Sequence, residues 1–244
     1  MQMIERAAVV AGTEVHLGIG STGATHCVLR TRSGVVRAVL KRIPVTHVLA
    51  EALCALILRG WGLPVPTPYL VPEGDSLAFA SADAGYPNLK QRLGVDTLRS
   101  GTPAHGAAMR IAMQVASTLS TAAAVAAADE ALANRDRNLE NILWDGETEA
   151  WIDHAYALGN RPDLADVNKL CNMALAVGTG EEFQHGAIAA WMALDRTQPA
   201  QQAEQLSDVA DLSAWTATIA HRLNHLGERL LARFPSPDDL LSAV

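Results

Sequence analysis

The sequence predicts an α+β fold of two lobes, a smaller β-rich lobe followed by a larger helical one. Three observations predict it. Short strand-like segments separated by turn signals, with one helix among them, fill the region before residue 81. After a loop of turn-forming residues at 81–87, the sequence is mainly helical. Strands that precede helices, instead of alternating with them, indicate an α+β architecture, here with a cleft between the lobes.

The N-terminal strands are identified as β-branched and apolar runs bounded by turn formers. One helix interrupts them: Thr46 can cap a helix that runs through Glu51 to about Arg59, and glycines then act as stop signals. The proline-rich segment 63–68 must be extended, because each proline disfavours helix at the residue before it. The predicted strands are residues 7–11, 26–31, 35–41, 69–71 and 76–80.

The loop after the last of these strands is the predicted lobe boundary, so that residues 1–82 form the N-terminal lobe and residues 83–244 the helical lobe of one domain. The segment 104–127 reads as a long helix that is apolar on most sides and is therefore expected to be central. Two short strands flank the turn Asp145-Gly146. These strands are residues 142–144 and 150–152, and the three predicted final helices are residues 164–177, 182–194 and 212–234.

Composition predicts a folded protein with a substantial core, since 49% of the residues are hydrophobic and 18% are charged. The net charge of −7 argues against direct nucleic-acid binding or attachment to an anionic membrane. The three cysteines are far apart and suggest neither a disulfide framework nor a metal site. The N-terminus has no signal-peptide pattern, and no apolar run reaches membrane-spanning length. We therefore expect a cytoplasmic protein.

The central polar segment carries the strongest functional signal. Asp136 and Asn141 are five residues apart, and Asp153 follows twelve residues later, directly after a short apolar strand. This spacing is typical of a kinase-type phosphoryl-transfer centre, where one carboxylate orients the attacking hydroxyl while an amide and a second carboxylate hold Mg²⁺ on ATP. Magnesium prefers such hard oxygen ligands. The alternative is a loop of turn-forming Asx residues, but apolar segments flank it and Asp153 is not needed for a turn.

A lysine at the end of the strand 35–41 is the second signal. Lys41 shares a strand face with Arg37 and can neutralise the α- and β-phosphates of a nucleotide. Glu51, ten residues later on the following helix, can hold the lysine in place. A surface ion pair is the alternative interpretation, and Arg37 and Arg42 are rival cations.

A glycine-rich loop lies between the first two predicted strands, with the pattern Gly18-x-Gly20-x-x-Gly23. It is not a Walker A loop, because no Gly-Lys-Ser/Thr follows, and the strand after it disfavours a dinucleotide-binding turn. Its position is that of a lid over ATP's phosphates, whose oxygens the backbone N–H groups can meet, although a flexible hairpin turn is the alternative. Phosphorylation of its hydroxyl groups would block the nucleotide. Those hydroxyls belong to Ser21, Thr22 and Thr25.

With Asn134-x-Asp136-Arg137-x-x-x-Asn141, Ile152-Asp153-His154 and the upstream Lys41, the chain resembles the HipA-like serine/threonine kinases, especially their compact stand-alone members. It is more distantly similar to phosphatidylinositol 4-kinases. The resemblance covers roughly residues 18–175. It implies a two-lobed protein-kinase-like fold, ATP and Mg²⁺ as cofactors, and phosphorylation of a Ser or Thr hydroxyl in a protein. An antitoxin or other regulatory protein is a candidate partner, although the chain is shorter than two-part HipA toxins.

The resemblance also implies a role for each matched residue. Asp136 corresponds to the catalytic aspartate, Asn141 and Asp153 to the magnesium ligands, and Lys41, with Glu51 as its partner, to the ATP-phosphate lysine. The segment from Ser81 through Asp83 to Gly85 corresponds to the interlobe hinge that meets adenine.

Two other functions fit parts of the pattern. Aminoglycoside-type phosphotransferases space their Asp, Asn and Asp residues alike, but they usually carry His where this chain has Arg135. A nucleotide-binding pseudokinase that acts as a scaffold is the non-enzymatic alternative. The joint presence of Lys41, Asp136, Asn141 and Asp153 argues against it, because a scaffold does not need the complete set.

Overall fold

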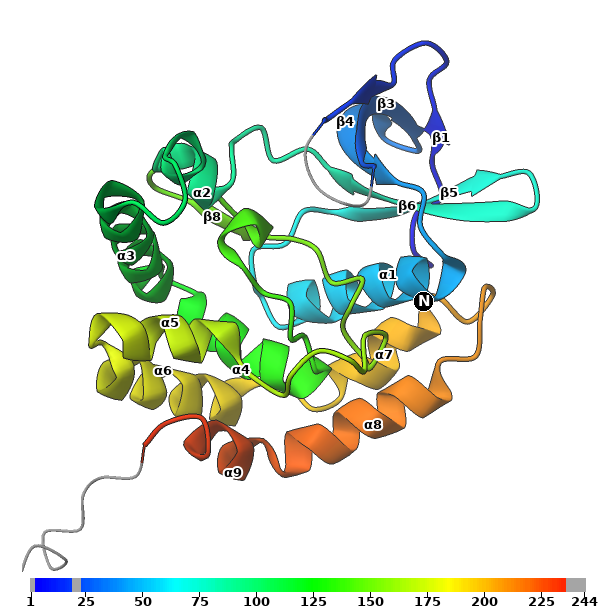
Figure 1. Cartoon of the computed structure of the whole chain (residues 1–244). Coiled ribbons are helices and arrows are strands. Elements are labelled where there is room, and N and C mark those ends of the chain that lie inside the picture. Colours follow the sequence, from blue (N-terminus) through cyan, green and yellow to red (C-terminus); the bar gives the residue numbers. More distant parts are fainter. Residues whose placement is uncertain (1–2, 19–22, 236–244) are drawn as a thin grey trace, which may run out of the picture.

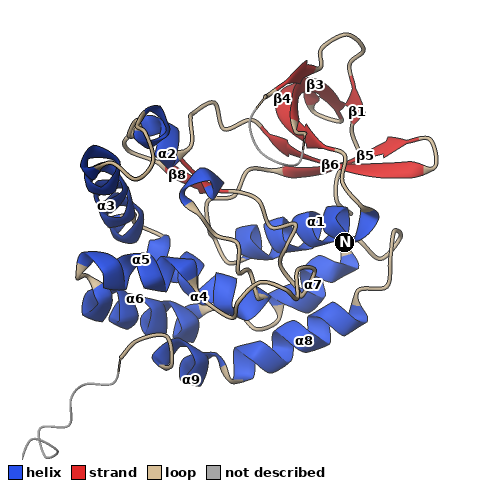
Figure 2. Cartoon of the chain, in the orientation of Figure 1, coloured by secondary structure: helices blue, strands red, loops and turns tan. Residues whose placement is uncertain are grey.

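The computed structural model describes residues 3–18 and 23–235 and has a β-rich part followed by a helical part (Figures 1 and 2). The first part is an antiparallel sheet in the order β1-β3-β4-β6-β5, with β2 paired to β3. These strands are β1 (Ala8–Val9), β2 (Val15–His16), β3 (Thr25–Thr31), β4 (Gly34–Lys41), β5 (Pro68–Glu73) and β6 (Ser76–Ala82). The predicted α+β class and two-lobed, kinase-like arrangement are confirmed.

The sheet separates two apolar clusters because side chains alternate along its strands. On β5, Tyr69 and Val71 belong to a small cluster on one face. Leu70 between them, and Phe79 on β6, join the large core on the other face. Helix α1 (Val45–Gly60) packs against that second face and buries most of its length there (Figure 1). This helix therefore connects the β-rich lobe to the main core.

The helical part wraps around α4, whose residues are almost all buried. A separate two-stranded sheet pairs β7 with β8. The elements are α2 (Leu89–Arg92), η1 (Val95–Thr97), α3 (Pro103–Thr118), α4 (Ala122–Leu132), η2 (Leu139–Asn141), β7 (Ile142–Trp144), β8 (Glu149–Trp151), α5 (Lys169–Val177), α6 (Gly180–Ala193), α7 (Gln198–Glu204), α8 (Ser213–Asn224) and α9 (Leu226–Leu231).

The prediction of one long central helix at residues 104–127 is wrong, because the chain bends by 86° between α3 and α4. Ser120 Oγ and the Thr121 backbone N–H both donate to Glu149 Oε1, at 2.7 and 2.9 Å, so the linker's polar groups are fixed to β8 instead of continuing a helix. Only α4 is central. Helix α3 exposes half of its residues and buries only Ala112, Ala116 and Ser117.

The last predicted helices also need correction. The segment 212–234 is two helices, α8 and α9, that meet at His225. Helix α5 begins only at Lys169, because the Asn168 side chain caps it by accepting from the Cys171 N–H. The short helices α2 and α7 were not predicted.

Within the described ranges, no single helix is long and apolar enough to cross a membrane. Helices α3 and α4 reach the length and composition of a span only when taken together across their bend.

Strand β6 ends at Ala82, the residue at which the chain was expected to divide, and this division into lobes stays a prediction.

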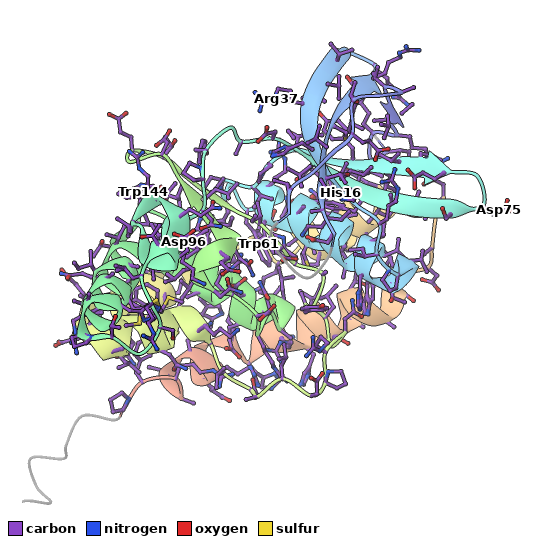
Figure 3. All side chains as sticks on the ribbon, turned by 45° about the horizontal axis from the view of Figure 1, so that its top comes forward. His16, Arg37, Trp61, Asp75, Asp96 and Trp144 are labelled. Atoms are coloured by element: carbon purple, nitrogen blue, oxygen red, sulfur yellow. The ribbon has the colours of Figure 1, made fainter. Side chains whose placement is uncertain are left out.

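Figure 3 marks Arg37 on β4 and Asp75 at the tip of the β5–β6 hairpin in the β-rich part, and Asp96 and Trp144 in the helical part.

Candidate active site

Lys41, the last residue of β4, lies at the centre of a buried ion-pair group. Its Nζ donates to Glu51 Oε1 at 2.5 Å and to Asp153 Oδ1 at 2.9 Å. Glu51, on α1, is 1% exposed and its other oxygen accepts from the His154 backbone N–H at 2.8 Å. The Lys41–Glu51 pair is the one expected from the sequence, and the structure adds Asp153 to it. Three segments distant in sequence thus converge on one ammonium group.

The charges of this group stabilise one another. Burial alone would lower the pKa of Lys41, but the carboxylates of Glu51 and Asp153 raise that pKa above its ordinary value. Burial likewise opposes ionisation of Glu51, yet Lys41 and the hydrogen bond with His154 lower the pKa of Glu51 below its usual range. Both groups are therefore charged at neutral pH. The rival cations lie elsewhere, since Arg37 pairs with Asp83 and Arg42 with Glu73.

A buried carboxylate on α4 holds the loop that carries Asp136. Asp129 accepts from the Asn134 side chain at 2.9 Å and from Arg137 Nε and Nη2, both at 2.9 Å. Asp129 and Arg137 are each 1% exposed, so this bidentate pair is screened from water. Because Asn134 and Arg137 flank Asp136 on both sides, Asp129 fixes the backbone from which Asp136 projects.

Arg137 also connects this loop to the segment before Asp153. Its Nη1 donates to the carbonyl oxygen of Ile152 at 2.6 Å and to that of Asn141 at 3.3 Å. The Ile152 N–H in turn donates to the Asn141 carbonyl at 3.1 Å. The two predicted magnesium ligands therefore stand on adjacent backbone segments held by one guanidinium group.

Asp153 adopts a left-handed backbone conformation, with φ of 65°. Such angles are uncommon outside glycine, although Asp and Asn tolerate them best. Asp153 lies two residues after the end of β8 and directly precedes His154, whose N–H is anchored on Glu51. Surrounding contacts thus enforce a backbone angle that sets the direction of the Asp153 carboxylate.

Asp136 makes its side-chain contact with a residue that the sequence analysis did not single out. Lys169 Nζ, at the start of α5, donates to Asp136 Oδ1 at 2.8 Å. Asn141 donates from Nδ2 to the Asp136 backbone carbonyl at 2.9 Å, which leaves its Oδ1 pointing the other way. Both carboxylate and lysine are partly exposed.

These side chains line one cavity between the β-rich and helical parts. Lys41, Asp136, Asn141 and Asp153 all contribute to a cavity of about 350 Å³. A narrower cavity of about 60 Å³ continues from it and shares Lys41 and Asp153. The four residues that the sequence predicts for the phosphoryl-transfer centre therefore lie together in space.

The predicted hinge residues border the narrower cavity. Ser81 and Asp83 both line it, next to Val39 of β4. The Asp83 carboxylate is engaged by Arg37 Nη2 at 2.8 Å and by the Gly85 N–H at 2.9 Å. The Asp83 carboxylate is thus already engaged by protein partners, and the Asp83 backbone N–H also donates to the Arg37 carbonyl at 2.8 Å.

The glycine-rich loop borders the larger cavity through its two ends. The Leu17 N–H donates to the Ala24 carbonyl at 3.1 Å, and both residues line the cavity. Gly18 and Gly23 adopt φ of 64° and 61°, conformations that glycine permits at little cost. Gly20, Ser21 and Thr22 lie outside the described residues. Thr25 is buried on β3, which makes its hydroxyl a poor target for phosphorylation.

The oxygen donors at the cavity fit magnesium held jointly with a nucleotide. Asn141 Oδ1 and the Asp153 carboxylate are hard ligands, and none of the described residues that line the cavity is a cysteine. Among residues 3–18 and 23–235, no three His, Cys, Asp or Glu side chains are arranged to hold a metal ion by themselves. Magnesium is commonly bound by one or two protein oxygens together with substrate phosphates and water, so such a cluster is not required.

The supporting residues Asp129 and Lys169 were missed by sequence reasoning. A signal existed for Asp129, because two acidic residues, Asp129 and Glu130, end an otherwise apolar alanine-rich helix. Buried charges of this kind need partners. Lys169 had no local signal, since its partner Asp136 is 33 residues away.

The fold is that of a kinase. A proinflammatory kinase of Helicobacter pylori, CtkA, superposes with a TM-score of 0.61 at 12% identity, covering 95% of this chain and 99% of the other. HipA of Shewanella oneidensis MR-1, from a toxin–antitoxin complex with HipB and operator DNA, gives a TM-score of 0.48 at 14% identity, covering 93% of this chain and 65% of HipA. No protein-family model and no curated protein matches the sequence. The resemblance to HipA-like kinases is thus confirmed at the level of fold.

Proposed function

We propose that this chain is an ATP- and Mg²⁺-dependent kinase that transfers the γ-phosphate to a Ser or Thr hydroxyl of a protein. The observation that carries the proposal is the single cavity lined by Lys41, Asp136, Asn141 and Asp153. A kinase fold with these four groups at one cavity has the parts that phosphoryl transfer requires. Bound Mg-ATP would supply the transferable phosphoryl group and the cation that neutralises it.

Each residue has a distinct task in the proposed reaction. Asp136 accepts the proton of the attacking hydroxyl as its oxygen bonds to the γ-phosphorus, and the bond to the β–γ bridging oxygen breaks to release ADP. Lys41, held by Glu51, binds the phosphate chain. Asn141 and Asp153 hold the metal. Lys169, 2.8 Å from Asp136 Oδ1, keeps that carboxylate in place and adds positive charge near the transferred group.

Adenine is proposed to occupy the narrower cavity between Val39 and the Ser81–Asp83 segment. The glycine-rich loop of Gly18, Gly20, Ser21, Thr22 and Gly23 is proposed to cover the phosphates. A protein acceptor, a cytoplasmic location and a regulatory or antitoxin partner complete the proposal, on the basis of the sequence resemblance and the fold of the neighbours.

Incubation of the purified protein with γ-labelled ATP in cell lysate tests this function. Label should appear in protein bands with wild type and disappear with Asp136→Ala. Label confined to small molecules would instead identify a small-molecule phosphotransferase. If neither fraction is labelled although Mg-ATP binds, the chain is a nucleotide-binding scaffold.

A further inference from the structure

A second cavity, of about 190 Å³, lies beside the catalytic loop and is strongly basic. It is formed by the end of α4, the loop at residues 156–161 and α8. Three arginines line it: Arg135, Arg161 and Arg222. No Asp or Glu is among the described residues that line it. A cavity volume of roughly 10–15 Å³ is enough for one water molecule, so this cavity has ample room for a phosphate group.

One of these arginines has an unmet hydrogen bond. Arg135 Nη2 lies 3.2 Å from Asp166 Oδ1, but Arg135 Nε is buried and contacts no acceptor within the described part of the chain. A buried donor without an acceptor is destabilising, and such groups usually mark a bound ligand, ion or water. Arg135 Nε can therefore donate a hydrogen bond to an anion in this cavity.

The other two arginines have partners within the protein. Arg222 Nε donates to the Glu130 carbonyl at 2.9 Å, which caps the end of α4. Arg161 pairs with Asp163 at 2.8 Å, and its guanidinium lies 4.7 Å from the centre of the Tyr156 ring. The orientation of Arg222 is thus set before a ligand arrives, which reduces the ordering cost of binding.

Positive charge exceeds negative charge around the cavity. The three arginines that line the cavity and two neighbouring arginines that do not line it, Arg229 and Arg233, share three carboxylates, which leaves an excess of two positive charges. The five are Arg135, Arg161, Arg222, Arg229 and Arg233, and the carboxylates are Glu130, Asp163 and Asp166. Burial, and then the charge of Arg229, lower the pKa of Arg222 to about 10, which indicates that nearby carboxylates do not fully compensate this cation.

We propose that this cavity binds the phosphate of a phosphoserine or phosphothreonine in another protein, so that the kinase selects acceptors that already carry a phosphate. The selection of phosphorylated acceptors rests on the proposed kinase function, whereas the binding of a phosphate in this cavity does not. A phosphomonoester brings a charge of about −1.5 to −2 and three acceptor oxygens, which suits several guanidinium groups better than one carboxylate does.

The position of the cavity favours a ligand on a second molecule. Residues 154–168, between Asp153 and α5, contain no Ser or Thr that phosphorylation could turn into an internal ligand. Arg135 directly precedes Asp136, and Tyr156 lines both this cavity and the catalytic one. An extended acceptor that crosses Tyr156 would therefore contact both sites.

Calorimetric titration in the absence of ATP tests binding independently of phosphoryl transfer. The probes are acetyl-Gly-Ala-phosphoserine-Ala-Gly-amide, the same peptide with serine, and inorganic phosphate. The phosphopeptide should bind wild type at least tenfold more tightly than the serine peptide and inorganic phosphate do. Arg161→Gln, which changes an exposed ion pair, and Arg135→Gln should each weaken phosphopeptide binding at least tenfold.

Two further variants locate the binding site. Arg110→Gln, an exposed change on α3, should bind the phosphopeptide within twofold of wild type, and so should Lys169→Gln, which removes the contact with Asp136. Equal binding of the serine peptide, inorganic phosphate binding as tight as the phosphopeptide, or a loss with Lys169→Gln instead of the arginine variants would each overturn the proposal. Phosphopeptide binding without any kinase activity would retain this site and reject the proposed function.

Discussion

Arg137 donates to the carbonyl oxygen of Ile152 at 2.6 Å, and so joins the residue after Asp136 to the residue before Asp153. The same guanidinium is held by Asp129 through two bonds of 2.9 Å. The distance between the proposed base and the proposed metal ligand is therefore set by a buried charge pair, because neither segment can shift without moving Arg137. This pair is a structural support for the site and does not itself contact the cavity.

Replacement of Arg137 by Met should destabilise the protein by about 3–5 kcal/mol, because it leaves the Asp129 carboxylate buried without its partner. Urea unfolding followed by circular dichroism measures this change. Arg110→Met on the exposed face of α3 is the matched control and should change stability by less than about 0.5 kcal/mol. An Arg137→Met change below about 1 kcal/mol would contradict the structural role given to this pair.

Lys169→Gln should reduce kcat by about 10–100-fold and leave the affinity for Mg-ATP within twofold of wild type. The reason is that Lys169 contacts Asp136 and not Lys41 or Asp153. Steady-state kinetics with titration of ATP separates the two effects. Lys169→Arg should restore part of the rate. A variant that loses ATP affinity while keeping kcat would assign Lys169 to nucleotide binding instead.

Asp153→Asn should weaken Mg-ATP binding by at least tenfold. Asn tolerates the left-handed backbone at φ 65°, so the change removes the charge without adding the strain that Ala would bring. Thermal shift with ATP, with and without Mg²⁺, is the measurement: wild type should be stabilised by ATP only when Mg²⁺ is present. The exposed Asp145→Asn is the control. If ATP raised the melting temperature of wild type equally with and without Mg²⁺, the metal-binding role of Asp153 would be rejected.

Acid should weaken the Lys41–Glu51 pair in a specific range of pH. The pKa of Glu51 is lowered by folding, although burial opposes this, because Lys41 and the hydrogen bond with His154 favour the carboxylate. Its contribution to stability is therefore present above the ordinary pKa of 4.5 and is lost as pH falls below it. As the pH falls from 4.5 to 3, the free energy of unfolding of wild type, measured by urea titration, should decrease by up to about 1.4 kcal/mol more per pH unit than that of Glu51→Gln. Parallel pH profiles would contradict a charged Glu51.

The sequence was sufficient for the features that depend on local pattern. Lys41 at a strand end, and Asp136, Asn141 and Asp153 at fixed spacings around a short hairpin, could be selected because turn chemistry and strand alternation act over a few residues. The same local rules predicted the β-rich front and the helix that carries Glu51.

Features set by distant contacts could not be predicted. The bend between α3 and α4 depends on Glu149, 29 residues after Ser120 in the chain, which binds the linker. Helix propensity in an alanine-rich segment gives no sign of it. In the same way, Lys169 meets Asp136, and Arg161 joins Arg222 at one cavity, only after the chain has folded.

The most direct test of the account compares phosphoryl transfer with nucleotide binding in Asp136→Asn. At saturating Mg-ATP, we expect label transfer by this variant to fall by at least 100-fold, while its Mg-ATP affinity by calorimetry stays within about threefold of wild type. Transfer that persists at the wild-type rate would contradict the assignment of Asp136 as the base and, with it, the proposed phosphoryl-transfer centre.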